Sequence, residues 1–321
     1  MQVHKNLAAL PAFQHAVMTI GTFDGVHLGH RTILQQLKEE AAKVNGETVV
    51  VTFHPHPRKI VGDVPDIKVL TTLEEKIYLI KKEEIDHLVV VPFDENFSKI
   101  SAEAYIKGFL FETFRPHTII IGYDHHFGHD RTGNFLLLEQ YGKTFGFLVK
   151  EIPVQVIEAA AISSTRIRKA LLQSDIAIAQ HLLGYDYFFT GTIITGDQLG
   201  RTIGYPTANI QLSHTDKLVP GDGVYAIHFV VQDNSGRNNI VHSLNGMMYI
   251  GSRPVVNGKR RVIEVNIFDF NRNIYGATVQ VTIIDYIRSD MQLNGLAALQ
   301  QQLALDKQAV LQVLQHKNFI T

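Results

Sequence analysis

Residues 16–43 read AVMTIGTFDGVHLGHRTILQQLKEEAAK, and this stretch decides the fold of the first part of the chain. It opens with a short apolar run, passes through a turn rich in glycine, and continues with apolar residues at helical spacing. A buried strand that leads through glycines into a helix is typical of parallel α/β sheets. The stretch therefore predicts the first strand and the first crossover helix of such a sheet.

The same alternation continues along the chain. Further β-rich runs lie at residues 47–53, 87–93, 117–123 and 145–154, with helical patterns between them at 72–85, 102–114 and 135–143. Strands alternating with helices predict a doubly wound α/β domain, with a Rossmann-like parallel sheet covered by helices on both faces. Such sheets bind ligands beyond the carboxyl ends of their strands, so functional residues are expected in those loops.

After a helical stretch near residues 163–183, the pattern changes to short β-like segments separated by Gly, Pro and Asn. We count five of them, at residues 187–194, 223–232, 240–251, 261–269 and 278–287. Strands without long helices between them predict a small closed antiparallel β-barrel, followed by a C-terminal helix at residues 294–316. We place the boundary near Gly184, with domains at residues 1–184 and 185–321.

The composition limits the class of protein. With 321 residues, 45% of them hydrophobic, the chain is typical of a globular protein with two domains. Thirty Lys and Arg balance thirty-one Asp and Glu, so small molecules are expected as partners rather than nucleic acid. The absence of cysteine excludes disulfides and thiol chemistry. Without a signal-like start or a long apolar run, we expect a cytoplasmic protein with no membrane partner, and a monomer is slightly favoured.

The turn after the first strand carries His27 and His30 at helical spacing. Side chains three apart at a helix start share one face, so both imidazoles can reach one phosphate chain. Gly21, Gly25 and Gly29 let backbone N–H groups approach phosphate, and the helix N-terminus adds a favourable dipole. This HxGH pattern resembles the signature of the nucleotidylyltransferase superfamily. The alternative is that the glycines only make a turn.

Three further segments follow in order: TFHPHP at residues 52–57, GYDHHFGHDRTG at 122–133 and ISSTRIRKAL at 162–171. Together with GTFDGVHLGH at 21–30, they resemble the FMN adenylyltransferase domain of bacterial riboflavin kinase/FAD synthetases. The resemblance implies transfer of AMP from ATP to the phosphate of FMN, with Mg²⁺ on the triphosphate and release of pyrophosphate. Because the FMN phosphate is already ionised, this reaction needs positioning and charge neutralisation rather than a strong base.

The same resemblance implies a set of site residues. His27, His30 and Arg168 would stabilise charge on the phosphates and so act in catalysis. The residues that would bind ATP are Gly21, Phe23, Asp24, Gly25, Gly29, Ser164, Thr165 and Arg166. Those near the flavin nucleotide would be Asp124, Phe127, Gly128 and Arg131.

Several other histidines leave alternatives open. His125 stands where the family often has an aromatic residue. Together with His126 and His129 it could instead bind a transition metal. His54 and His56 are flanked by prolines, so a structural turn and a ligand contact are both open for them.

The decisive run of the barrel region is GTIITGDQLGRTIGYPTANI at residues 191–210. Thr207 and Asn209 are two positions apart, so in an extended strand they point the same way and can hold Mg²⁺ and phosphate together. The segment resembles the riboflavin kinase signature. This resemblance implies that Glu264 takes the proton from the 5′-hydroxyl of riboflavin as ATP transfers its phosphoryl group. The loop around the nucleotide would include Gly196, Gly200, Arg201 and Gly204.

Some features of the second site allow other interpretations. Strand alternation alone would make Glu264 a solvated carboxylate, and Arg201 could either meet phosphate or cap the loop. Val255 and Asn266 depart from the family pattern, so two polar contacts are expected to be missing or rebuilt. The leading hypothesis is a two-step enzyme that converts riboflavin to FMN and FMN to FAD. The alternatives are an adenylyltransferase with a weak kinase, a flavin-responsive regulator without turnover, and a cytidylyl- or pantetheine-type transferase.

Overall fold

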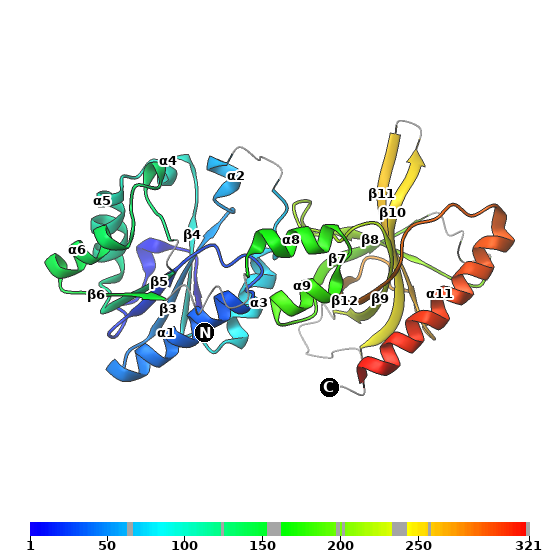
Figure 1. Cartoon of the computed structure of the whole chain (residues 1–321), viewed down its shortest axis with the longest axis horizontal. Coiled ribbons are helices and arrows are strands. Elements are labelled where there is room, and N and C mark those ends of the chain that lie inside the picture. Colours follow the sequence, from blue (N-terminus) through cyan, green and yellow to red (C-terminus); the bar gives the residue numbers. More distant parts are fainter. Residues whose placement is uncertain are drawn as a thin grey trace. The chain divides into compact units, whose positions relative to one another are not determined.

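The computed structural model describes residues 1–62, 67–122, 125–152, 162–196, 200, 203–232, 243–255 and 258–318. Of the predicted site residues, Asp124 and Arg201 lie outside these ranges. The chain divides into two compact units, Met1–Ser164 and Thr165–Thr321 (Figure 1). The helices after residue 164 therefore pack with the second unit. The boundary near Gly184 follows the change of sequence pattern, and it stays a prediction about the functional domains.

The first unit contains a six-stranded sheet with the order β1-β4-β3-β2-β5-β6, in which all neighbours are parallel. The strands are β1 (Gln2–His4), β2 (Val17–Ile20), β3 (Thr48–His54), β4 (His87–Pro92), β5 (Thr118–Gly122) and β6 (Leu148–Ile152). The strand order changes direction at β2, which has β3 on one side and β5 on the other. Open parallel sheets bind ligands at such a switch point, so the site is expected beyond the carboxyl end of β2.

The edge strand β1 is a difference from the sequence prediction, which starts the alternation at residue 16. Gln2–His4 pairs with His87 to Val89 of β4. Two of its three residues are exposed, and it lacks the apolar run that marks the central strands. A short edge strand is held by backbone pairing rather than by core burial, so hydrophobic periodicity does not reveal it.

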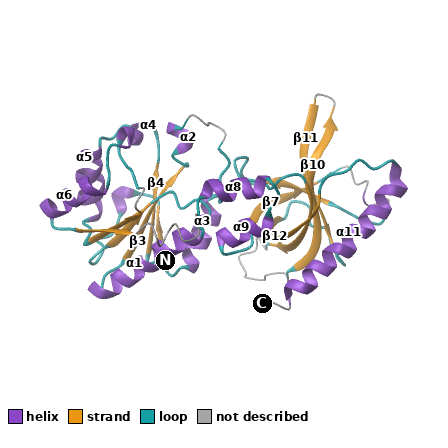
Figure 2. Ribbon diagram, in the orientation of Figure 1, coloured by secondary structure: helices purple, strands orange, loops and turns teal. Residues whose placement is uncertain are grey.

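Helices cover both faces of the sheet (Figure 2). One face contacts α1 (Leu28–Val44), which packs on β2, β3 and β5. The other face meets a π-helical segment (Tyr105–Glu112), whose Tyr105 and Phe109 share a core with Val49 and Ile119. The remaining helices of this unit are α2 (Arg58–Val61), α3 (Leu73–Lys82), α4 (Glu95–Ser98), α5 (Ala102–Ala104), α6 (Phe135–Phe145) and the 3₁₀ turns Leu7–Ala9 and His129–Arg131. The doubly wound α/β prediction is confirmed.

The second unit contains a closed antiparallel barrel with the order β10-β11-β8-β7-β12-β9, closed because β9 also pairs with β10. Its strands are β7 (Phe188–Ile194), β8 (Ala208–Leu212), β9 (Gly223–Val231), β10 (Leu244–Val255), β11 (Gly258–Ile267) and β12 (Thr278–Arg288). The barrel is confirmed, but the predicted count of five strands is wrong among the described residues. The sixth is β8, with the sequence ANIQL, which is too short and polar to show alternation.

Two helices precede the barrel, α8 (Ser164–Leu172) and α9 (Ile176–Leu183), where the sequence shows one helical stretch. Ser174 separates them with a φ of 60°, a left-handed conformation that ends the first helix. Its hydroxyl lies 2.8 Å from the Tyr225 hydroxyl of β9. Gln180 Nε2 also donates to the Ile284 carbonyl of β12, at 2.9 Å. These bonds hold the helix pair on the barrel.

The C-terminal helix α11 (Gly295–Asn318) packs along β9, β10 and β12, as Figure 1 shows. Val310 and Leu314 bury their side chains against Met247 and Phe268 of the barrel region. Arg288 at the end of β12 donates from Nε and Nη2 to the two oxygens of Asp306, both at 2.7 Å. Within the described residues, no helix combines the length and the apolar character needed to cross a membrane.

Candidate active sites

The loop between β2 and α1 has an unusual backbone. Phe23, Gly25 and Val26 all have positive φ values, of 47°, 85° and 38°. This conformation is strained for Phe and Val, and surrounding contacts must hold it. The Gly25 N–H donates to Thr71 Oγ1 at 3.1 Å, and the Val26 N–H donates to the Phe23 carbonyl at 3.2 Å. The predicted phosphate turn is thus a tightly held loop at the switch point of the sheet.

Asp24 fastens this loop to the segment before α3. Its carboxylate is 1% exposed and accepts hydrogen bonds from the N–H groups of Leu70, at 2.9 Å, and Thr71, at 3.1 Å. The backbone carbonyl of Asp24 accepts a bond from Ser164 Oγ at 3.0 Å. These contacts give Asp24 and Ser164 a structural function in the loop, and their predicted contacts with ATP stay predictions.

His27 and His30 lie together at the start of α1, as the sequence predicts. Their rings stack with centroids 3.6 Å apart and an interplanar angle of 14°. His27 caps the helix, because its Nδ1 accepts from the His30 N–H at 3.3 Å. A Cβ on Gly29 would lie 3.3 Å from His27 Nδ1, so the glycine leaves room for this ring. On its other side, His30 lies 5.0 Å from the Phe23 ring.

The environment of His30 favours a neutral imidazole. Burial lowers the pKa of His30 well below its usual 6.5, and His27 and Lys76 lower it further. Its Nδ1 is buried and has no hydrogen-bond partner among the residues that the structure describes. Buried polar atoms are almost always paired, so an unpaired ring nitrogen beside a held turn indicates a place for a ligand or water.

Lys76 is the functional candidate that the motifs do not reveal. It lies on α3 with 6% exposure, and its Nζ donates to the Thr22 carbonyl at 2.6 Å and to Thr52 Oγ1 at 3.2 Å. The helix periodicity contains the signal: Lys76 is three residues after Leu73 and four before Ile80, both buried. A lysine on the apolar face of an amphipathic helix is unusual, because lysine is almost never fully buried.

The segment at residues 125–133 packs on the core. Phe127 is buried and its ring lies 5.2 Å from the Tyr105 ring at 25°. Gly128 has a φ of 74°, and a Cβ there would lie 2.7 Å from Ala102 Cα, so only glycine fits. Arg131 is exposed. The structure gives Phe127 and Gly128 a packing function, and the flavin contacts of this segment stay predictions.

The metal alternative for His125, His126 and His129 gains no support from the described residues. Within the described residues, no three His, Asp or Glu side chains are grouped so that they could hold a metal ion. His129 Nδ1 instead lies 3.1 Å from Asp130 Oδ2. Nδ1 of His56 accepts from the Arg58 N–H at 3.2 Å, a contact that belongs to the local turn.

In the second unit, Asn209 of β8 and Glu264 of β11 are direct cross-strand partners. On β11, Ile263, Val265 and Ile267 are buried, so Glu264 points to the opposite face of the strand and is half-buried. Side chains directly opposite each other on antiparallel strands lie about 5 Å apart at Cβ. The structure therefore brings the predicted base and one predicted metal ligand together.

Three glycines of the preceding loop have different functions in the backbone, and one of them lies against Asn209. A Cβ on Gly196 would overlap Nδ2 of Asn209, while Oδ1 would lie 3.2 Å away, so the amide nitrogen packs on the glycine. A Cβ on Gly200 would overlap the Tyr205 carbonyl. Gly204 has a φ of 83°, with nothing near its Cβ position. The first two glycines are needed for close approach, and Gly204 is needed for its conformation.

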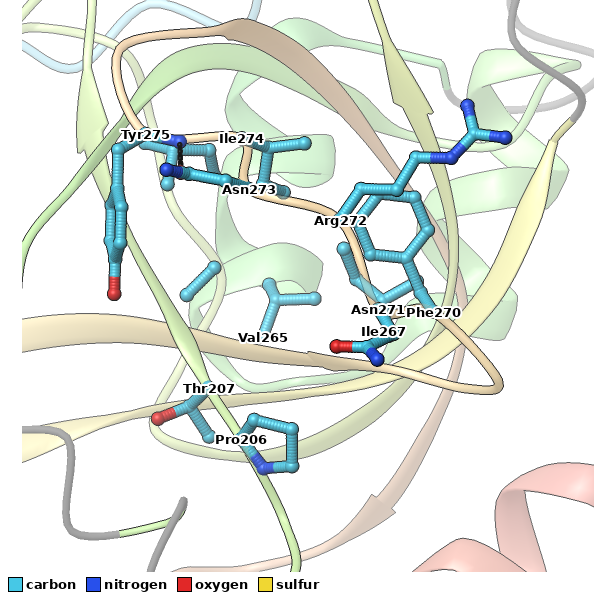
Figure 3. A pocket seen from close by; sticks show the side chains of 12 residues that line it. Pro206, Thr207, Val265, Ile267, Phe270, Asn271, Arg272, Asn273, Ile274 and Tyr275 are labelled. Carbon is cyan, nitrogen blue, oxygen red and sulfur yellow. Dashed lines mark hydrogen bonds between the residues drawn. The ribbon is translucent and has the colours of Figure 1, made fainter.

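Thr207 lines a cavity of about 460 Å³ (Figure 3). The cavity lies between the start of β8, the end of β11 and the loop before β12. In Figure 3, Asn273, Ile274 and Tyr275 of that loop face Thr207 across the opening. The complete lining is Ile193, Pro206, Thr207, Ala208, Val265, Ile267, Phe270, Asn271, Arg272, Asn273, Ile274 and Tyr275. The predicted site residues do not include this loop, although its polar run NRN begins four residues after the end of β11.

Asn266, which departs from the family pattern, makes a polar contact of its own in this structure. It is 7% exposed and its Nδ2 donates to the Pro206 carbonyl at 2.8 Å. This bond joins β11 to the residue before Thr207. The side chain of Val255 lies outside the described part.

Besides Ser164, three of the predicted residues lie on α8. Thr165 and Arg166 are exposed in its first turn, and Arg168 is half-buried. They belong to the second compact unit. Their predicted contacts with the phosphates of ATP stay predictions.

Known proteins show the same pair of modules. A family model described as FAD synthetase matches residues 10–166, and one described as riboflavin kinase matches residues 183–314. The bifunctional riboflavin kinase/FMN adenylyltransferase of Haemophilus influenzae is 38% identical over 293 residues, covering 91% of this chain and 92% of that protein. The protein of the same name from Escherichia coli K12 is 35% identical over 302 residues, covering 94% and 93%.

A solved structure supports the fold over nearly the whole chain. The crystal structure of a macrolide-efflux protein from Streptococcus pneumoniae matches with a TM-score of 0.82 and 31% identity, covering 96% of this chain and 98% of that chain. The name is that protein's own, and the match shows a shared fold. The chain belongs to the family of bifunctional riboflavin kinase/FMN adenylyltransferases, with a FAD synthetase domain in its N-terminal part and a riboflavin kinase domain in its C-terminal part.

Proposed function

We propose that the chain makes FAD from riboflavin in two steps, each in its own unit. The second unit phosphorylates riboflavin to FMN with ATP, and the first transfers AMP from a second ATP to FMN, releasing pyrophosphate. The observation that carries the proposal is that each unit retains its polar pair: stacked His27 and His30 at the switch point, and Asn209 opposite Glu264 in the barrel. A cytoplasmic location stays a prediction from the sequence.

In the kinase step, Glu264 accepts the proton of the riboflavin 5′-hydroxyl as that oxygen attacks the γ-phosphorus of ATP and ADP leaves. An alcohol must lose its proton during transfer, and a carboxylate is a suitable acceptor. The half-buried position of Glu264 beside Asn209 supports this role, because the carboxylate sits next to a group suited to the phosphate end of ATP.

Thr207 and Asn209 fit a divalent cation such as Mg²⁺. Both offer neutral oxygen ligands, which hard cations prefer, and packing of the Asn209 nitrogen on Gly196 leaves Oδ1 as the outer atom of the carboxamide. When bound, Mg²⁺ would neutralise charge on the phosphates. The two side chains would hold the metal and the phosphate chain against the start of β8.

The cavity beside Thr207 is the proposed place for the ATP base. Its volume of about 460 Å³ lies in the usual range of small-molecule sites. Thr207 is part of the lining, whereas Glu264 is not. The phosphate end of ATP would therefore point from the cavity towards β8, with the riboflavin hydroxyl on the Glu264 side.

In the adenylylation step, His27 and His30 donate hydrogen bonds to the phosphates of ATP. The lowered pKa of His30 keeps its imidazole uncharged near pH 7, so it donates without bringing in a charge that must be desolvated. The FMN phosphate attacks the α-phosphorus in line. Pyrophosphate leaves as the new bond forms, and the binding of pyrophosphate by Ser164, Thr165, Arg166 and Arg168 stays a prediction from the sequence.

Separate incubations test the proposal. The purified chain is given riboflavin or FMN with ATP and Mg²⁺, and the flavins are separated by chromatography. FMN and FAD should form from riboflavin, FAD should form from FMN, and a chelator should stop both. FAD from FMN alone would support the adenylyltransferase with a weak kinase. Flavin binding without any product would support the regulator.

A further inference from the structure

The ammonium of Lys76 lies near the carboxyl ends of two neighbouring strands of the first unit, β2 and β3. Its Nζ donates to the Thr22 carbonyl in the loop after β2, and to Thr52 Oγ1 near the carboxyl end of β3. Thr52 Oγ1 in turn donates to the Thr22 carbonyl at 3.1 Å. The ammonium thus holds one end of the loop that carries His27 and His30.

Burial of the Lys76 ammonium costs desolvation free energy unless other groups compensate the charge. A buried ammonium requires compensation, and the nearby carboxylate of Asp24 accepts the backbone N–H groups of Leu70 and Thr71. An ammonium has three N–H donors, and two of them have acceptors within the described part of the chain. The buried Nδ1 of His30 has no partner there either. The third N–H of Lys76 and the Nδ1 of His30 therefore indicate that a bound ligand or water completes the hydrogen bonds at this end of the loop.

We propose that Lys76 is a positioning residue of the adenylylation site, whose ammonium holds the 21–30 loop and supplies the positive charge that an anionic nucleotide substrate requires there. The inference rests on the proposed function of the first unit. Lys76 lies outside the HxGH motif. If it has this function, nucleotide binding depends on whether its side chain is protonated.

The electrostatics give this idea a measurable consequence. Burial lowers the pKa of Lys76 to about 8, while the Asp24 carboxylate opposes the shift. The titratable groups that interact electrostatically with Lys76 are Asp24 in the loop and His30 on α1. An anion bound near Lys76 favours its charged form and so raises its pKa. The positive charge is present below pH 8 and lost above it, so nucleotide binding should weaken as the pH rises through about 8.

The first experiment compares Lys76→Met with Lys81→Met in the full chain. Both substitutions remove one charge from α3, but Lys81 is exposed in the last turn. Rates of FAD formation from FMN and ATP are measured from pH 7 to 9, where the phosphates of both substrates are mostly ionised. Wild type and Lys81→Met should lose kcat/KM above about pH 8. The kcat/KM of Lys76→Met at pH 7 should be about tenfold or more below that of wild type, and it should not decline further above pH 8.

Riboflavin phosphorylation by the same preparations shows whether the rest of the chain is intact. A parallel decline of Lys76→Met and wild type over pH 7–9 would overturn the proposal, as would equal rates for Lys76→Met and Lys81→Met. If wild type makes no FAD from FMN at all, the proposed function fails instead, so the two failures are distinguishable.

A second measurement does not depend on the folding of Lys76→Met. ATP binding to the chain with Thr207→Ala and Asn209→Ala, which weaken the kinase site, is followed calorimetrically at pH 8 in two buffers of different ionisation enthalpy. Uptake approaching about half a proton per ATP is expected, because the group is half-protonated at its pKa. Absence of uptake would overturn the proposal, and so would uptake that survives Lys76→Met.

Discussion

Asn209 and Glu264 face each other across β8 and β11, although 55 positions separate them in the sequence. The register places a carboxamide and a carboxylate on the same face of the barrel, opposite to the buried Ile263 and Val265. A group that binds the phosphate end of a nucleotide and a group that accepts a proton are therefore adjacent. This pairing gives the kinase unit its chemistry.

Glu264→Gln should slow riboflavin phosphorylation by roughly 10²–10⁴-fold, because the amide cannot accept the proton. Adenylylation of added FMN should be unchanged, since that reaction occurs in the other unit. Initial rates with riboflavin and with FMN measure the two effects. A kinase rate like that of wild type would remove Glu264 from the role of base.

His30→Ala should reduce FAD formation from FMN by roughly 10²-fold, because one donor to the phosphates is lost. FMN formation from riboflavin should continue at the wild-type rate. Chromatography of a single incubation with riboflavin and ATP should therefore show accumulated FMN. Equal loss of both products would contradict the assignment of the two steps to separate units.

Gly196→Ala should impair the kinase without touching a catalytic group. The new Cβ would overlap the Asn209 amide and displace it, and a displacement of about 1 Å can cost as much as 10²-fold in rate. Kinase kcat and the KM for ATP report the effect. Gly108→Ala is the matched control, because the nearest atom to its Cβ is Glu112 Oε2 at 4.0 Å. Similar kinase rates for the two variants would refute the crowding argument.

Asn266→Ala should destabilise the barrel unit by about 1–3 kcal/mol, because the Pro206 carbonyl loses its donor. The KM for ATP should rise more than kcat falls, since the freed segment carries Thr207. Denaturant unfolding and kinase kinetics measure the two effects. An unchanged KM would mean that the bond serves stability alone.

The pH dependence of stability should reflect His30. Its pKa is lowered in the folded state, so above pH 6.5 both folded and unfolded states hold it neutral and no penalty exists. As the pH falls below 6.5, the unfolded state takes up the proton first and folding weakens. Between pH 7.5 and 5, the melting temperature should fall less for His30→Asn than for wild type. Identical losses would show that His30 is not buried in this way.

The order of strands and helices and the positions of both motifs are determined by the sequence alone. Periodicity and glycine-rich turns are local properties, so the stretch at 16–43 already indicates strand, turn and helix. The spacing of His27 and His30 likewise determines that they share a helix face.

Contacts between residues far apart in sequence were decided only by the tertiary structure. The exposed β1 and the short β8 are defined by their partners, β4 for one and β7 and β11 for the other. Phe127 lies in the core because Tyr105 is there to cover it. Lys76 contacts the loop after β2, and the loop before β12 faces Thr207. Both contacts join groups far apart in the sequence, and local sequence patterns do not predict which distant segments will meet.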